Sequence, residues 1–253
     1  MNTVDSVNGL NQAYESQQAD IDTASDDYAG RFAGPVGEYF LKLQEEITIS
    51  LIDAWRGARV LDVGGGHGQL AIPLVREGFA VTVAGSDPAC RNRLDRALPA
   101  DSFQFEVCDL LNLPFEDRSF DIVIAFRLLP HEEQWQRQIA EMCRVAKYAV
   151  VADYPDIRSF NFLYQSLFTM KKGFEKNTRE FLLFRRSEIV RAFQQNGFAD
   201  TTLKPQFFIP MVVHRFLRSV PLSRLLEGAS AALGLRYLLG SPVIVRARRP
   251  ESS

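Results

Sequence analysis

Short apolar runs and amphipathic stretches alternate through the first three-fifths of the chain. Val60, Leu61 and Val63 form a run of strand-forming residues that is typical of a buried strand. Further runs of this kind span 79–84, 103–107, 120–126 and 148–152. Helical patterns lie between the runs, at about 68–77, 88–97 and 132–145. Strands that alternate with helices at this pitch predict a parallel, doubly wound α/β sheet.

The pattern differs on both sides of this region. A helix is predicted over 38–55, where apolar residues recur at three- and four-residue spacing. After Asp153 two helical insertions are expected, at about 155–186 and 211–240. Between and after them we expect a helix at 188–196, a strand at 201–209 and an antiparallel strand near one edge at 241–246. The predicted fold is a Rossmann-like, seven-stranded, mostly parallel sheet with helical cap insertions.

Composition predicts one globular domain. The chain has 253 residues, of which 46% are hydrophobic, and its net charge of −2 gives no indication of nucleic-acid binding. Residues 1–26 are polar and acidic, unlike a secretory signal. They are expected to be flexible, or to form a weak helix that folds only against the body, so the domain is predicted to span 27–253. No apolar run reaches the length of about 18 residues that a membrane span needs.

The cysteines and histidines give no sign of a metal site. The chain has three of each, and neither set shows a zinc-binding spacing. A sparse, odd number of cysteines suits a reducing compartment. A cytoplasmic protein without a metal is therefore predicted, and its oligomeric state is not indicated.

Charge is unevenly distributed along the chain. The residues from Met1 to Asp53 hold ten acids and two bases, whereas those from Thr202 to Ser253 hold eight bases and two acids. Arginines and large apolar residues alternate within the second predicted insertion. This pattern suits either a solvated basic face or peripheral contact with a membrane surface.

A glycine-rich turn follows the first predicted strand. Gly64, Gly66 and Gly68 form a G-x-G-x-G pattern, and Asp62 lies two residues before it inside the apolar run. Dinucleotide-binding enzymes use G-x-G-x-x-G instead, and the third glycine of that pattern is misplaced here. An acid followed by glycines at alternate positions therefore favours a different nucleoside cofactor.

With these residues the sequence resembles the class I S-adenosylmethionine-dependent methyltransferases, in particular the type 11 small-molecule group. The resemblance covers roughly Tyr28 to Val151. It implies that Asp62 and the three glycines hold the methionine end of S-adenosylmethionine. It further implies that Asp87, after the second strand, binds the ribose hydroxyls, since a carboxylate accepts two hydroxyl protons well. The alternative for Asp87 is a helix cap before Pro88.

The resemblance extends to the adenine and to a lid. The acid after the third strand reaches the adenine amino group in the family, which implies this role for Asp109, with Leu110 beside the ring. Asp109 could instead be a turn aspartate. Tyr28 and Arg31 stand where family members close a lid over the cofactor, and simple packing is the alternative.

His131 is the candidate catalytic residue. It follows the fourth strand, where many type 11 relatives also place a histidine, and it would accept a proton from a methyl acceptor that must lose one. A capping or packing role is the alternative. The N/D-P-P-Y/F motif of many amino and nucleic-acid methyltransferases is absent, since Arg127-Leu128-Leu129-Pro130 stands there.

The predicted activity is therefore methyl transfer to oxygen or carbon of a small molecule. Aromatic residues in the first insertion suit a flat or lipophilic acceptor, unless they form the core of the insertion itself. One rival is a non-catalytic, cofactor-binding module built on a methyltransferase body. An NAD-dependent oxidoreductase is disfavoured by the glycine spacing.

Overall fold

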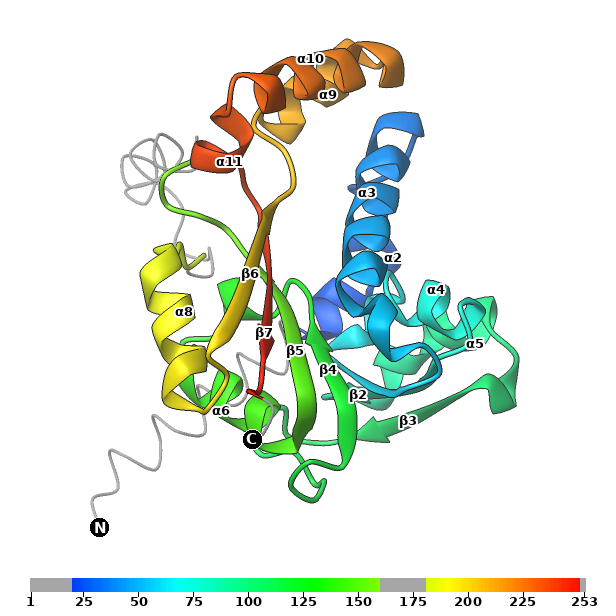
Figure 1. Cartoon of the computed structure of the whole chain (residues 1–253). Helices are drawn as coiled ribbons and strands as arrows, with labels where there is room; N and C mark the ends of the chain where they lie inside the picture. Colours follow the sequence, from blue (N-terminus) through cyan, green and yellow to red (C-terminus); the bar gives the residue numbers. More distant parts are fainter. Residues whose placement is uncertain (1–19, 160–180, 251–253) are drawn as a thin grey trace, which may run out of the picture.

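A computed structural model describes residues 20–159 and 181–250, and Figure 1 shows a seven-stranded sheet that helices cover on both faces. The strand order is β3-β2-β1-β4-β5-β7-β6. Strands β1 to β5 pair in parallel, and β7 runs antiparallel to both β5 and β6. The strands span Arg59–Val63 (β1), Ala80–Gly85 (β2), Phe103–Val107 (β3), Phe120–Ala125 (β4), Ala146–Tyr154 (β5), Asp200–Pro205 (β6) and Val243–Arg248 (β7). This confirms the predicted doubly wound sheet.

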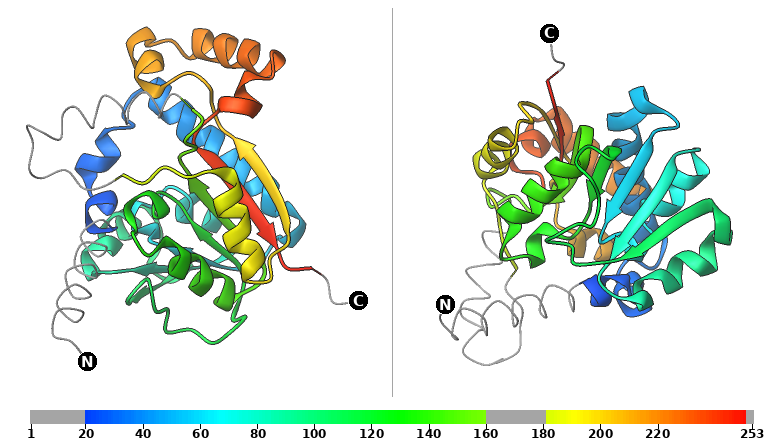
Figure 2. Two further views of the ribbon diagram at one scale, coloured as in Figure 1. Left: turned by 90° about the vertical axis from the view of Figure 1, so that its left-hand side faces the viewer. Right: turned by 90° about the horizontal axis from the view of Figure 1, so that it is seen from below.

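Two apolar clusters hold the helices against the sheet. On one face, α6 and α8 bury Ile139, Met142, Ile189 and Phe193 against β4 and β5. On the other face, α3, α4 and α5 bury apolar side chains such as Leu51, Leu74 and Leu94 against β1 and β2. Figure 2 shows the sheet between these two helical layers. The central strands are apolar on both faces because both faces are covered.

The α-helices agree with the predicted segments, although their starts differ. They span Asp26–Gly30 (α2), Pro35–Ile52 (α3), Ala71–Arg76 (α4), Asn92–Ala97 (α5), Trp135–Val145 (α6), Arg186–Gln195 (α8), Met211–Leu217 (α9), Val220–Ala232 (α10) and Leu235–Leu239 (α11). Helix α4 starts at Ala71 rather than Gly68. The later start places Pro73 in the first turn, where a helix tolerates a proline. Helix α8 starts two residues before the predicted start at 188, and Arg185 is its N-cap.

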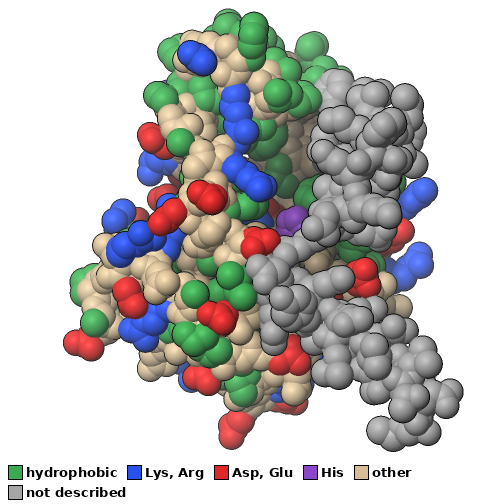
Figure 3. Space-filling view, turned by 180° about the vertical axis from the view of Figure 1, so that it is seen from behind, with side chains coloured by type: hydrophobic (Ala, Val, Ile, Leu, Met, Phe, Trp, Pro, Cys, Tyr) green, Lys and Arg blue, Asp and Glu red, His purple; other side chains and the backbone are tan. Residues whose placement is uncertain are grey.

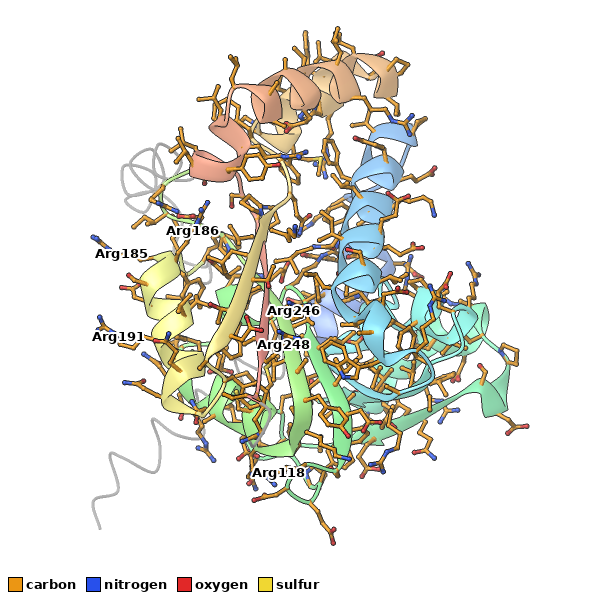
Figure 4. All side chains as sticks on the ribbon, viewed as in Figure 1. Arg118, Arg185, Arg186, Arg191, Arg246 and Arg248 are labelled. Atoms are coloured by element: carbon orange, nitrogen blue, oxygen red, sulfur yellow. The ribbon has the colours of Figure 1, made fainter. Side chains whose placement is uncertain are left out.

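Strand β7 is antiparallel, as predicted, and lies one strand in from the edge strand β6. The Arg246 guanidinium donates to the carbonyl of Leu51 in α3 and to the hydroxyl of Thr202 in β6. Figure 4 labels Arg246 and Arg248 on β7, beside β6. The last strand therefore fastens the antiparallel edge of the sheet to α3.

The expected boundary at residue 26 is wrong for its last residues. Residues 20–24 are helical, and the side chains of Asp20 and Thr23 are buried against the domain. The Asp20 carboxylate accepts hydrogen bonds from Ser86 and Cys90, and these tertiary contacts hold residues 20–24 against the domain. Residues 1–19 lie outside the described part of the chain, as does most of the first predicted insertion, over 160–180.

Helices α9, α10 and α11 form the second predicted insertion. They lie together at the end of the molecule farthest from β3, above the sheet in Figure 1. Within residues 20–159 and 181–250, no helix has both the length and the apolar character that crossing a bilayer would require.

Candidate functional site

The glycine turn after β1 adopts a conformation that depends on missing side chains. Gly64 and Gly68 both have φ of +70°, and a short 3₁₀ helix, Gly65–His67, lies between them. A Cβ atom on Gly65 would come within 2.3 Å of the carboxyl carbon of Asp62. The backbone of the turn is therefore pressed against the acid that precedes it.

Asp62 is fully buried, and neither of its carboxyl oxygens makes a hydrogen bond of normal geometry with the described residues, although the backbone N–H of Ala71 is near enough to lower its pKa. Burial, and then the nearby Asp20 carboxylate, raise the pKa of Asp62 to about 8. A buried carboxyl group without donors is costly when charged, so it holds its proton at neutral pH. A cation placed beside it would favour the ionised form.

His67 fastens the turn to β4. Its Nδ1 accepts from the backbone N–H of Gln69 at 3.1 Å, which leaves the proton on Nε2, 3.4 Å from the carbonyl oxygen of Phe126. Burial, followed by the charge of Arg127, lowers the pKa of His67 to about 3. The imidazole is therefore neutral and serves to orient the turn.

A second buried acid reaches the turn from residues 20–24. Asp20 Oδ2 accepts from the backbone N–H and the hydroxyl of Ser86, at 2.7 and 2.8 Å, and from the Cys90 thiol at 3.3 Å. Its Oδ1 lies 3.4 Å from the place where Gly64 would carry a Cβ. Burial is the main cause that raises the pKa of Asp20. Two acids thus flank the turn, and the charge of Asp20 disfavours ionisation of Asp62.

A small cavity opens between the turn and the end of β4. Its lining includes Asp20, Thr23, Gly64 and His131, together with residues 126–128. Residues 20–24 and the glycine turn therefore lie on the same cavity as His131, the predicted base. The space-filling view in Figure 3 shows the face behind the view of Figure 1, on which one histidine side chain is visible.

The family model for the type 11 methyltransferase domain matches residues 61–149, the stretch that contains the turn and strands β2 to β4. This stretch of the chain therefore matches the type 11 methyltransferase domain.

Two curated relatives illustrate the similarity. A 2-phytyl-1,4-naphthoquinone methyltransferase of Nostoc punctiforme is 28% identical over 51% of this chain and 63% of its own length. A 27-O-demethylrifamycin SV methyltransferase of Amycolatopsis mediterranei is 31% identical over 44% of this chain and 46% of its own length. The chain thus spans about half to three-fifths of the relatives it matches.

The fold extends beyond the matched stretch. A crystal structure of magnesium protoporphyrin IX methyltransferase from Synechocystis, with bound SAH, superimposes with a TM-score of 0.62. The superposition covers 93% of this chain and 100% of that one at 17% sequence identity. The methyltransferase fold therefore includes the helices and strands that follow β5.

The other predicted cofactor residues lie around the turn of the methyltransferase domain. Asp87 follows β2, and its Oδ1 accepts from the N–H of Ala89 at 2.7 Å. Asp109 follows β3 and accepts from the N–H of Leu111 at 2.9 Å, which is a turn-type contact. Leu110 is buried, and its side chain borders the turn at Gly64. Both acids therefore make the local contacts that the alternative interpretation expected, on the edge of the sheet that carries the turn.

His131 lies at the end of a short 3₁₀ helix, Leu129–His131, on the wall of the cavity. Its ring meets that of Phe181 edge to face, with 5.5 Å between the centroids. The backbone N–H of Leu182 donates to the carbonyl of Pro130 at 2.9 Å. The chain that returns from the first insertion is therefore fastened beside the predicted base.

Arg127 was not identified from the sequence as a site residue. It follows β4 with φ of +60°, an uncommon conformation for a residue with a side chain. Its N–H donates to Asp153 at 2.6 Å, and its guanidinium lies 4.2 Å from the centre of the Phe32 ring and 5.4 Å from that of Tyr28. Burial lowers the pKa of Arg127. No pattern in the sequence signals a left-handed arginine.

Tyr28 and Arg31 are placed by this contact. The Arg31 guanidinium lies 5.0 Å from the centre of the Tyr28 ring. Two arginines, Arg31 and Arg127, therefore contact this ring. Burial raises the pKa of the Tyr28 hydroxyl. Tyr28 thus packs against a residue of the cavity wall, Arg127.

The buried acids of the site suit the cationic groups of S-adenosylmethionine. Its amino and sulfonium groups are cationic, and the turn presents two buried acids with oxygens that lack hydrogen-bond partners among the described residues. A pyrophosphate would oppose ionisation of those same acids, whereas a cation favours it. In the described part of the chain, no group of three or more His, Cys, Asp or Glu side chains is placed to hold a metal ion.

Proposed function

We propose that this protein transfers a methyl group from S-adenosylmethionine to oxygen or carbon of a small molecule. The observation that carries the proposal is Asp62, a fully buried acid beside a glycine turn that makes no hydrogen bond of normal geometry with the described residues. A polar group of this kind is costly unless a ligand completes it. The type 11 domain match and the methyltransferase fold support the same activity.

Each predicted residue would have a role that its position supports. Asp62 and Asp20 would attract the cationic methionine end of the cofactor. Asp87 would accept from the ribose hydroxyls with the carboxylate oxygen that does not cap Ala89. Leu110 would pack on the adenine, with Asp109 at its rim.

The cofactor, when bound, supplies an activated methyl group and its own leaving group. The protein therefore has to align the acceptor and exclude water from the cavity. His131, on the cavity wall, would take the proton from an acceptor hydroxyl as the new bond to carbon forms. Phe126, Leu128 and Phe181 make this side of the site apolar and aromatic, which favours a flat or lipophilic acceptor.

Two measurements test the proposal. Isothermal calorimetry with S-adenosylhomocysteine should show saturable binding that Asp87→Ala weakens about tenfold, the value expected for a lost pair of charge-assisted hydrogen bonds. Asp101→Ala, at an exposed acid outside the site, is the matched control and should bind normally. A folded wild-type protein without binding would refute the proposal.

The His131 role is tested separately by turnover. His131→Ala and His131→Gln should each lower kcat by about hundredfold with a panel of phenolic and hydroxylated acceptors, because neither side chain acts as a base. The affinity for S-adenosylhomocysteine should stay unchanged. Full turnover in both variants would remove the base assignment while leaving the cofactor site intact.

A non-catalytic cofactor-binding module is the second candidate. The cavity beside His131 is small, and Asp20 and Thr23 form part of its wall, which leaves little room for an acceptor. Tight cofactor binding without methyl transfer to any acceptor in the panel would favour this candidate. Titration with NADH should show no fluorescence change, and binding there would instead favour an oxidoreductase.

A further inference from the structure

Helix α10 is oriented with its polar side toward the protein. Its buried side chains are Ser223, Glu227 and Ser230. Its leucines face outward, and Leu225 is 69% exposed. A helix on the surface of a globular domain normally turns its apolar stripe to the core. The outward leucines therefore need an explanation other than folding of this domain.

The inward polar side chains are fully engaged, so the orientation of α10 is fixed. Glu227 accepts from the backbone N–H groups of Phe208 and Ile209, each at 2.9 Å. His214 of α9 bridges the network, with Nε2 3.1 Å from Glu227 and Nδ1 3.0 Å from the Ser223 hydroxyl. Rotating the helix to bury its leucines would break all of these bonds.

The outward surface of α9, α10 and α11 is apolar, and we call it the cap face. Its most exposed members are Val212, Phe216, Leu225, Leu233, Tyr237 and Leu238. Phe216 is 86% exposed, an unusual state for a large aromatic side chain that has no partner to cover it. Figure 3 shows hydrophobic side chains over this end of the molecule, with basic side chains among them.

The charges on the cap face all have one sign. The segment from Gln206 to Pro242 carries four arginines and a single acid, Glu227, which is buried in the network. The arginines are Arg215, Arg218, Arg224 and Arg236. An apolar surface with a positive rim complements an anionic, amphipathic partner.

The cap face is anchored to the methyltransferase body. Arg186, at the start of α8, donates to Asp156 at 2.6 Å and to the backbone carbonyl of Tyr237 at 2.8 Å. In Figure 4 Arg186 lies between α8 and α11, whereas Arg185 and Arg191 point away from the body. On the opposite side, the Arg224 guanidinium lies over the Tyr39 ring of α3, 5.0 Å from its centre. A surface that is held in this way can position the whole domain against its partner.

We propose that the cap face docks the protein onto an anionic lipid bilayer. Phe216 and the leucines would enter the boundary between headgroups and acyl chains, and the arginines would contact lipid phosphates. A second copy of the chain fits less well, because two cap faces would bring like-charged rims together. The proposal rests on the cap face alone and does not depend on methyl transfer.

Sedimentation with lipid vesicles tests the proposal on the full chain. The protein should bind vesicles that contain phosphatidylglycerol more tightly than vesicles of phosphatidylcholine alone, and salt should weaken this preference. Phe216→Ser combined with Leu225→Ser should reduce binding by at least about tenfold, through lost apolar burial. Arg218→Asn combined with Arg236→Gln should reduce the preference for anionic vesicles about tenfold.

Tyr148→Ser is the matched control, because Tyr148 is an exposed aromatic residue at the far end of β5. It should bind vesicles as the wild type does, and thermal unfolding should show that all variants are folded. Absence of the folded wild type from anionic vesicles would overturn the proposal, as would undiminished binding by the Phe216 and Leu225 variant. A stable dimer that this variant dissociates would also overturn it, in favour of self-association through the cap face.

Discussion

The glycine turn and the cap helices both bury polar side chains, but they differ in how those side chains are satisfied. At the turn, Asp62 is buried without hydrogen-bond partners among the described residues. Under the cap face, Glu227 accepts from two backbone N–H groups and from His214. An incomplete polar group points to a ligand, whereas a complete network points to a scaffold. The same distinction separates the proposed cofactor site from the support of the proposed membrane surface.

The largest expected effect breaks the complete network. Glu227→Ala leaves the N–H groups of Phe208 and Ile209 and the ring of His214 without their acceptor in a buried place. We expect the free energy of unfolding to fall by about 3 kcal/mol, measured by urea denaturation. Glu188→Ala in α8, at an exposed acid, is the control and should cost less than about 1 kcal/mol. An equal loss in both variants would contradict a scaffold role for the network.

The second prediction concerns the incomplete group. Asp62→Asn keeps the size of the side chain but removes its charge, so S-adenosylmethionine should bind with about 2 kcal/mol less free energy. The fold should be retained, because the wild-type carboxyl group already holds its proton at neutral pH. Calorimetry measures the affinity, and thermal unfolding checks the fold. Unchanged affinity would show that Asp62 has only a structural role.

Asp20 should have a smaller effect in the same direction. Asp20→Asn removes a second charge at the turn and is expected to weaken S-adenosylmethionine binding by about 1 kcal/mol. The effect is smaller because Ser86 already donates two hydrogen bonds to this carboxylate. If the variant instead binds S-adenosylmethionine more tightly, residues 20–24 cover the cofactor site and must move away before the cofactor binds.

The last prediction is a pH dependence of stability without cofactor. The pKa of Asp62 rises from 3.8 in the unfolded chain to about 8 in the folded protein, so the folded state holds a proton that the unfolded state has lost. Its contribution to stability is therefore present below about pH 4 and declines as pH rises toward 8. Thermal unfolding from pH 6 to pH 8 should show this decline, and Asp62→Asn should flatten it. If the stability of the wild type rose from pH 6 to pH 8 while that of Asp62→Asn did not, Asp62 would not be the buried, protonated acid.

Sequence patterns predicted the strands and the turn because both depend on local signals. Apolar runs identified β1 to β5, and the alternate glycines match the two positive φ angles at Gly64 and Gly68. Asp20 was missed because its burial depends on Ser86, which is 66 residues away in sequence and leaves no periodicity. Asp153 could have been predicted from the sequence as a residue near the site, because an acid within an apolar strand needs a partner. Here the partner is the backbone N–H of Arg127.

The cap helices show a different limit of sequence analysis. Helical spacing predicted an insertion over 211–240, but spacing does not state which stripe of a helix faces the core. Spacing alone does not tell that Leu225 is exposed and that Glu227 is buried. Their actual positions follow from His214 and from two backbone N–H groups, which no local pattern contains.

The central claim is that the turn holds a buried, protonated acid that a cation completes. Calorimetry of S-adenosylmethionine binding at pH 7, in buffers of different ionisation enthalpy, counts the protons released. The account predicts release of about one proton by the wild type and almost none by Asp62→Asn. Binding without proton release, with equal affinity in the variant, would contradict it.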